Sequence, residues 1–71
     1  MSENIIIITV NRLEYPVPAE STVLQLLLEL GHTPTMTAVW INGEQILQEM
    51  LPRRVLLPGD SVKIYPILIG G

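Results

Sequence analysis

The part of the sequence with the clearest chemical potential is its end, where Gly70 and Gly71 follow the branched aliphatic residues Ile67, Leu68 and Ile69. At average glycine usage, two glycines at one given dipeptide position arise by chance roughly once in 200 chains. A terminal glycine offers a carboxylate, and a diglycine backbone can enter a narrow channel that any Cβ would block. The pattern indicates Gly71 as the working group, and a frayed end is the alternative interpretation.

The remaining residues form no set typical of catalysis or metal binding. The chain has no cysteine, and its single histidine, His32, follows a predicted helix end, where a solvated or capping role is the common one. No serine has a plausible histidine arrangement, and no phosphate-binding loop or metal motif occurs. We therefore predict that the protein is not an enzyme and holds no metal and no cofactor.

The composition limits the kinds of partner that the protein is expected to bind. The 71 residues carry a net charge of -3 with only four Lys and Arg, which argues against nucleic-acid binding. We interpret Arg53 and Arg54 as a solvated pair, with electrostatic steering toward an acidic partner as the alternative. No apolar run is long enough for a transmembrane helix, and no basic segment precedes Ile5. We expect one cytoplasmic domain covering residues 1–71.

Three strands are predicted from apolar runs. The β-branched run from Ile5 to Val10 is typical of a strand that is covered on both faces or lies at the sheet centre. A turn at Asn11-Arg12 leads to an edge strand from Leu13 to Pro18, because proline cannot donate to a ladder. The turn Pro58-Gly59-Asp60 starts the last strand, from Ser61 to about Tyr65. We predict that the first and last strands are neighbours.

The clearest helix lies between Thr22 and Gly31. Thr22 and Gln25 form a capping-box pattern, and Gly31 is a natural stop. Apolar residues follow helical spacing, so one stripe should pack on a sheet while Gln25 and Glu29 face water. The predicted stripe comprises Val23, Leu26, Leu27 and Leu30, widened by Leu24 and Leu28.

The chain between this helix and the last strand carries shorter elements. Ala38 to Ile41 reads as a strand that ends at the Asn42-Gly43 turn, and Gln45 to Leu47 as a short returning strand. A helical turn is expected within residues 48–54, with Met50 and Leu51 contributing to the core. Trp40 and Tyr65 are interpreted as core or half-buried strand residues.

This order of elements predicts an α+β fold, in which a mixed sheet of about four to five strands packs on one main helix. That layout is the β-grasp, or ubiquitin-like, architecture. Pro66 is expected to end regular pairing, which would leave a flexible C-terminal tail at about residues 66–71.

Four segments, in this order and spacing, carry a resemblance over nearly the whole chain. They resemble the sulfur carrier proteins of thiamine biosynthesis. The pair Tyr65-Pro66 is closer to the related small subunit of molybdopterin synthase, whereas the short length favours the thiamine type. The four segments are Ser21 to Leu27, Val39 to Glu44, Leu57 to Ile64 and Gly70-Gly71.

The resemblance implies that an ATP-dependent, E1-like adenylating enzyme activates Gly71 as an acyl-adenylate. A persulfide sulfur donor then converts it into a thiocarboxylate, which delivers sulfur to thiazole synthase or another sulfur-accepting enzyme. Gly70 and Gly71 would enter the partner's active site. Ile67, Leu68 and Ile69 would bind an apolar groove of the partner as an extended segment.

Two alternatives stay open at this point. A ubiquitin-like modifier would use the same activation to join Gly71 to a lysine of a target protein. The stretch from Ser21 to Ile64 also resembles the TGS domains of translation factors and synthetases, which would make the chain an RNA-binding module. The acidity of the chain counts against that second alternative.

Overall fold

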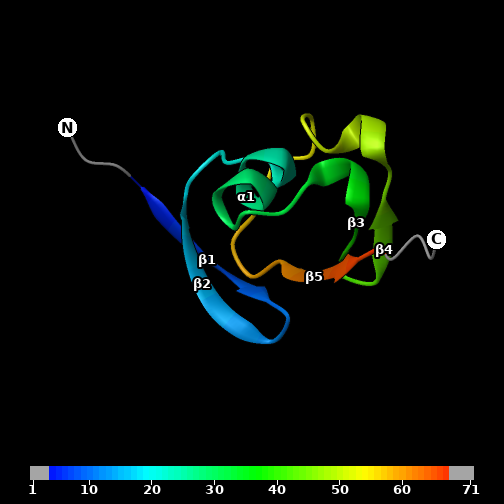
Figure 1. Ribbon diagram of the computed structural model, residues 1–71. Coiled ribbons are helices and arrows are strands. Elements are labelled where there is room, and N and C mark those ends of the chain that lie inside the picture. Colours follow the sequence, from blue (N-terminus) through cyan, green and yellow to red (C-terminus); the bar gives the residue numbers. More distant parts are fainter. Residues whose placement is uncertain (1–3, 68–71) are drawn as a thin grey trace.

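The computed structural model describes residues 4–67 and contains one α-helix on a five-stranded mixed sheet (Figure 1). The strand order is β2-β1-β5-β3-β4, so the last strand lies at the centre. β1 and β5 are parallel, and the other neighbours are antiparallel. This is the predicted α+β, β-grasp arrangement. The elements are β1 (Ile5–Val10), β2 (Leu13–Pro18), α1 (Val23–Glu29), β3 (Thr37–Ile41), β4 (Glu44–Ile46) and β5 (Ser61–Pro66), with the short 3-10 helices η1 (Pro34–Met36) and η2 (Gln48–Met50).

The hairpin between β1 and β2 turns at the two predicted residues. Asn11 and Arg12 have φ values of 49° and 75°, and a two-residue type I′ turn requires positive φ at both positions. The Asn11 side chain also bonds to the central strand, because its Oδ1 accepts from the Ile64 amide at 2.9 Å. Parallel pairing of β1 with β5 covers only two residue pairs. Asn11 therefore extends the contact between the hairpin and β5.

Of the two alternatives for the first strand, cover on both faces is wrong, and β1 lies inside the sheet next to the central strand β5. Ile8 is fully buried, whereas Ile7 is 47% exposed and Ile5 is exposed as well. In Figure 1, α1 lies over one face of the sheet, so alternate residues of β1 point away from it. The prediction that β1 and β5 are neighbours is confirmed.

Helix α1 is capped at both ends as its sequence predicts. The Thr22 hydroxyl accepts from the Gln25 amide at 3.2 Å, and the Thr22 amide donates to the Gln25 side chain at 2.9 Å. At the other end, His32 donates its amide hydrogen to the Leu27 carbonyl and Gly31 donates to the Leu28 carbonyl, which forms a Schellman motif. Gly31 takes φ of 82°, the left-handed conformation that this motif needs.

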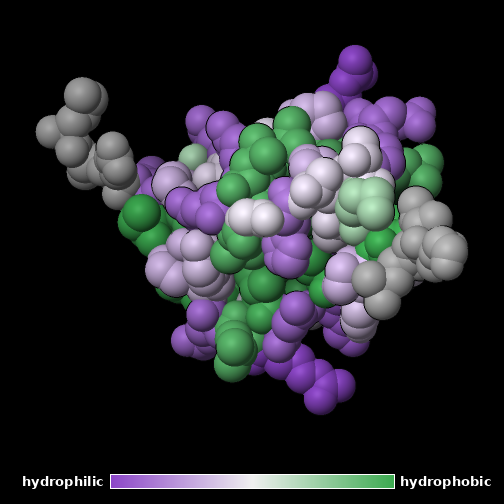
Figure 2. Space-filling model, in the orientation of Figure 1, coloured by the Kyte–Doolittle hydropathy of each residue, from purple (hydrophilic) through white to green (hydrophobic). Residues whose placement is uncertain are grey.

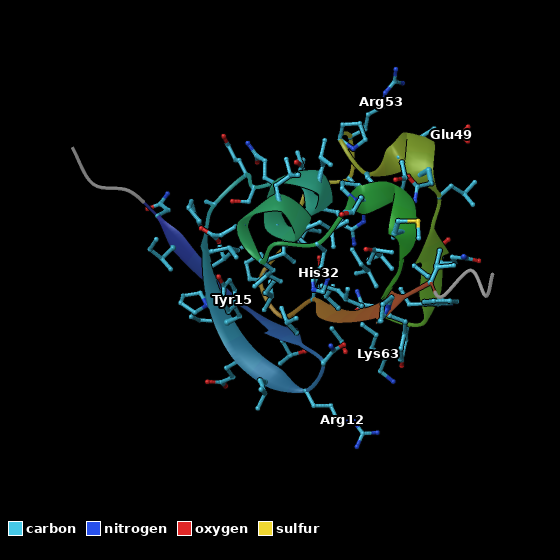
Figure 3. All side chains as sticks on the ribbon, in the orientation of Figure 1. Arg12, Tyr15, His32, Glu49, Arg53 and Lys63 are labelled. Carbon is cyan, nitrogen blue, oxygen red and sulfur yellow. The ribbon has the colours of Figure 1, made fainter. Side chains whose placement is uncertain are left out.

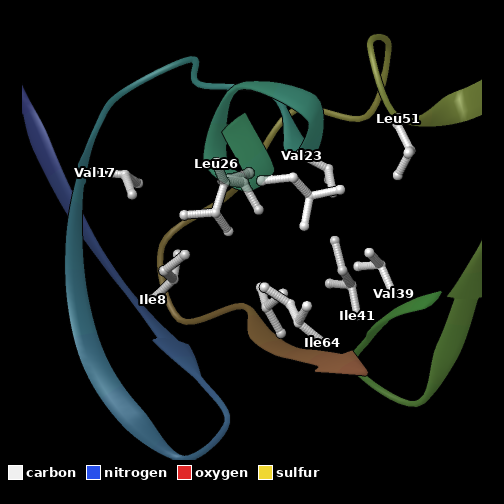
Figure 4. Close-up of a cluster of buried hydrophobic side chains, with 11 residues drawn as sticks. Ile8, Val17, Val23, Leu26, Val39, Ile41, Leu51 and Ile64 are labelled. Atoms are coloured by element: carbon white, nitrogen blue, oxygen red, sulfur yellow. The ribbon is translucent and has the colours of Figure 1, made fainter. Parts of the chain in front are cut away.

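The core lies between α1 and the sheet, and Figure 4 shows its aliphatic side chains facing one another across that layer. Two predicted members are absent from it, because Leu28 is 58% exposed and Met50 is also exposed. Leu24 and Leu30 are partly buried at its margin. The buried core residues are Ile8, Val17, Val23, Leu26, Leu27, Val39, Ile41, Leu51, Leu56, Val62 and Ile64.

Candidate functional site

The candidate site is the C-terminal end of β5. Ile67 is the last described residue, so the predicted site residues Leu68, Ile69, Gly70 and Gly71 lie outside the described part of the chain. Ile67 itself is exposed, as a partner-binding residue requires. The structure thus establishes which strand leads to the predicted reactive terminus and what surrounds its last residues.

Pairing of β5 continues past the expected end at Tyr65. Pro66 is opposite Thr37 in the antiparallel ladder, and the Ile67 amide donates to the Met36 carbonyl at 2.8 Å. Proline removes only its own N–H donor, so the residues on either side of it can still pair. The ordered strand therefore reaches one residue further than Pro66 was expected to allow, and Ile67 is held against η1.

A buried carboxylate fixes the start of β5. Asp60 is 5% exposed, and its Oδ2 accepts from the Leu57 amide at 2.9 Å and from the Arg54 guanidinium at 3.3 Å. Its Oδ1 accepts from the Asn42 amide group at 3.0 Å, and Asn42 Oδ1 in turn accepts from the Ser61 amide at 3.0 Å. The β3–β4 turn and two points of the segment between η2 and β5 are thus joined at Asp60, which sets the position where the strand begins.

The sheet face turned away from α1 carries aromatic residues beside β5. The rings of Trp40 and Tyr65 meet edge to face, with centroids 5.7 Å apart and planes at 77°. Trp40 is half-buried, as predicted, whereas Tyr65 is 51% exposed. Figure 2 shows that hydrophobic side chains also reach the surface in several other places, interrupted by hydrophilic ones. The end of β5 is therefore bordered by an exposed aromatic residue and an exposed aliphatic one, Ile67.

One polar contact ties the edge strand to the helix. The Tyr15 hydroxyl on β2 donates to Glu29 Oε2 on α1 at 3.1 Å. This hydrogen bond, together with desolvation and the negative charge of Glu29, raises the pKa of Tyr15 above its ordinary value of 10.0. The contact stabilises the position of β2 and has no geometric link to the end of β5.

Within residues 4–67, no group of three or more His, Cys, Asp or Glu side chains is arranged to hold a metal ion. His32 is half-buried, and its amide hydrogen caps α1. None of the helices in the described part of the chain is long and apolar enough to cross a membrane. In the same part, every buried side-chain nitrogen and oxygen has a hydrogen-bond partner.

The sequence pattern predicts Asn42 and Asp60 as turn-forming residues and indicates no role for Asn11 beyond the hairpin. The structure shows that their side chains also position β5. Asp60 could have been suspected from its place just before an apolar strand. Its partners could not, because Asn42 and Arg54 are brought to it only by the fold.

No protein-family model and no curated protein sequence matches the chain. Among solved structures, a thiamine biosynthesis protein, ThiS, from Geobacter metallireducens matches with a TM-score of 0.78 and 26% sequence identity. The match covers 93% of this chain and 99% of that one. The chain has the fold of ThiS. The likeness to ThiS confirms the predicted resemblance to the thiamine-biosynthesis family, and it extends over the whole domain rather than over a shared motif.

Proposed function

We propose that this protein is a sulfur carrier of thiamine biosynthesis whose Gly71 carboxylate is adenylated and then converted into a thiocarboxylate. The observation that carries the proposal is the likeness to ThiS over 93% of a chain whose sequence ends in Gly70-Gly71. In this proposal the protein is the carrier, and its partner enzymes catalyse the reactions. Use of ATP by the first partner makes the cytoplasm the expected location.

The proposed chemistry has two stages. The Gly71 carboxylate attacks the α-phosphorus of ATP on an adenylating enzyme, which forms the acyl-adenylate and releases pyrophosphate. The terminal sulfur of a persulfide then attacks the acyl carbon and displaces AMP. A second thiol cleaves the resulting acyl disulfide, so the thiocarboxylate leaves as one product and a disulfide as the other. Thiazole synthase or another sulfur-accepting enzyme takes the sulfur.

The described geometry suits a carrier because β5 is fixed at both ends. Asp60 and Asn42 hold its start, and the bond from Ile67 to Met36 holds its end. Gly71 is the fourth residue after Ile67, and four extended residues span at most roughly 14 Å. A partner must therefore come close to the end of β5 in order to reach the Gly71 carboxylate.

Intact-mass spectrometry tests the proposal directly. The full chain is incubated with ATP, the adenylating enzyme of the same organism and a persulfide donor, and a chain lacking Gly71 is the control. The expected result is the mass increase of one oxygen-to-sulfur exchange, located at Gly71 by fragmentation. An unchanged mass with partners that are active on another carrier contradicts the proposal. A stable isopeptide adduct without thiocarboxylate would instead indicate a ubiquitin-like modifier.

A further inference from the structure

Two of the four cationic side chains lie together near Tyr65, at the margin of the site described above. Arg12 on the hairpin and Lys63 on β5 line one shallow hollow of about 240 Å³, together with Asn11 and Tyr65. Figure 3 shows Arg12 and Lys63 at the hairpin end of the molecule and Arg53 at the opposite side. The hollow therefore concentrates positive charge on one part of an acidic protein.

Neither cation of this hollow is neutralised by the described part of the molecule. Among residues 4–67 the ion pair present joins Arg54 to Asp60, and no carboxylate lies within 4.0 Å of Arg12 or Lys63. Both side chains are exposed. Their charges are thus available to an external anion.

The backbone at Arg12 gives a second, independent indication. Its φ of 75° falls in the left-handed region, at the turn position where glycine is strongly preferred. A side chain there costs conformational energy, and such costs concentrate at residues with a functional role. An arginine at this position destabilises the turn relative to glycine, and it places a guanidinium at the rim of the hollow.

The surroundings of the hollow favour a protein surface over a nucleic acid. Tyr65 lines it, and Trp40 contacts Tyr65 edge to face, so apolar area adjoins the two cations. Nucleic-acid binding draws on many phosphate contacts, whereas this chain has four Lys and Arg and a net charge of -3. Two cations beside the exposed Tyr65 ring and the half-buried Trp40 ring fit a protein interface with an apolar centre and acidic groups at its rim.

We propose that this hollow binds carboxylates on the enzyme that adenylates Gly71. The inference rests on the proposed function. It adds which surface of this protein the enzyme contacts and which chemical groups of the enzyme bind there. Tyr65 is six residues before Gly71, and six extended residues span roughly 20 Å, so an enzyme that holds Gly71 in its active site can also cover the hollow. Charge pairing there increases the association rate and fixes the orientation of the carrier.

The test uses the full chain with three single variants, Arg12→Gly, Lys63→Gln and the matched control Arg53→Gln. Dissociation constants for the organism's adenylating enzyme are measured by titration calorimetry without ATP, at low and high salt. Arg12→Gly and Lys63→Gln should each raise Kd by roughly 1.5- to 5-fold at low salt, with a smaller effect at high salt, and Arg53→Gln should not change it. Arg12→Gly should also keep or raise the melting temperature, because glycine suits the turn.

In Arg12→Gly the affinity for the enzyme should fall while the melting temperature stays the same or rises. This combination distinguishes a docking role of Arg12 from a structural one. If Gly71 of the wild-type chain becomes a thiocarboxylate but both variants bind the enzyme as the wild type does, the docking surface is wrong and the proposed function stands. An equal loss in Arg53→Gln would show a general charge effect and also overturn the docking surface. A wild-type chain that neither binds nor is modified overturns both proposals. RNA binding that is lost in the Arg12 and Lys63 variants would assign the hollow to nucleic acid instead.

Discussion

Asp60 shows how much a single residue contributes to the placement of β5. Its carboxylate accepts hydrogen bonds from Asn42, Arg54 and the Leu57 amide, and it is nearly inaccessible to water. Removing this carboxylate would take a hydrogen-bond partner from three donors at once, and hydrogen bonds to charged groups contribute more to stability than neutral ones. Asp60 therefore stabilises the position of β5 in addition to forming a turn.

We predict that Asp60→Ala lowers the free energy of unfolding by about 3 kcal/mol, since three hydrogen bonds to a buried carboxylate are lost. Urea denaturation of the variant and the wild type measures this loss. Glu49→Ala is the control, because Glu49 is an exposed carboxylate on η2. A stability equal to that of the control variant would show that water replaces Asp60 at no cost.

At the scale of elements, local sequence patterns predicted the helix, strands and turns correctly, but they did not predict the burial of every side chain. The capping box of α1, the Asn11-Arg12 turn and the prolines of the edge strand each act within a few residues, so the sequence was enough to predict them. Leu28 was misassigned because all the leucines of the helix were counted as one stripe. At 100° per residue, Leu28 is about 140° from Val23 around the helix axis, on the side that faces water.

Paired leucine variants test this division of α1. Leu27 is fully buried and Leu28 is 58% exposed, so the two neighbours differ in environment and not in chemistry. Leu27→Ala should cost on the order of 2 to 5 kcal/mol of unfolding free energy. Leu28→Ala should stay within roughly 0.5 kcal/mol of the wild type. Equal losses in chemical denaturation would mean that Leu28 packs on something in solution.

The contact between β2 and α1 predicts a stability change at high pH. The neutral Tyr15 hydroxyl donates to Glu29, and this bond raises the pKa of Tyr15. Its stabilising contribution is complete below the ordinary pKa of 10.0 and is lost as the pH rises through the raised value of the folded protein. Tyr15→Phe should therefore be less stable than the wild type at neutral pH, and the difference should shrink above pH 10.0. A difference that does not change with pH in thermal melts would contradict this role.

At the scale of the whole molecule, the topology was predictable because the two most apolar strands had to be neighbours. The hydrogen-bonded group at the start of β5 was not, since Asn42 is 18 residues from Asp60 and meets it only after folding. The hollow at Arg12 and Lys63 was missed for the same reason, because these residues are 51 positions apart. The prediction that Gly70 and Gly71 form a reactive terminus rests on the sequence.

The extent of the buried core predicts the effect of removing the last residue of the chain. The buried cluster of the described residues extends from Ile8 to Ile64. We expect deletion of Gly71 to abolish thiocarboxylate formation and to leave the melting temperature unchanged. Thermal denaturation and intact-mass spectrometry of one preparation measure both quantities. A large drop in melting temperature would show that the terminus contributes to the fold.

The parallel pairing of β1 with β5 also affects how the domain responds to mechanical force. The first and last strands run side by side in the same direction, so opposite ends of the pair face the two termini of the domain. A pull on the end of β5 against the start of β1 therefore shears their hydrogen bonds together instead of opening them one by one. An enzyme that draws the terminus into a deep active site, or a protease that pulls on it, should meet a domain that resists extension along this axis.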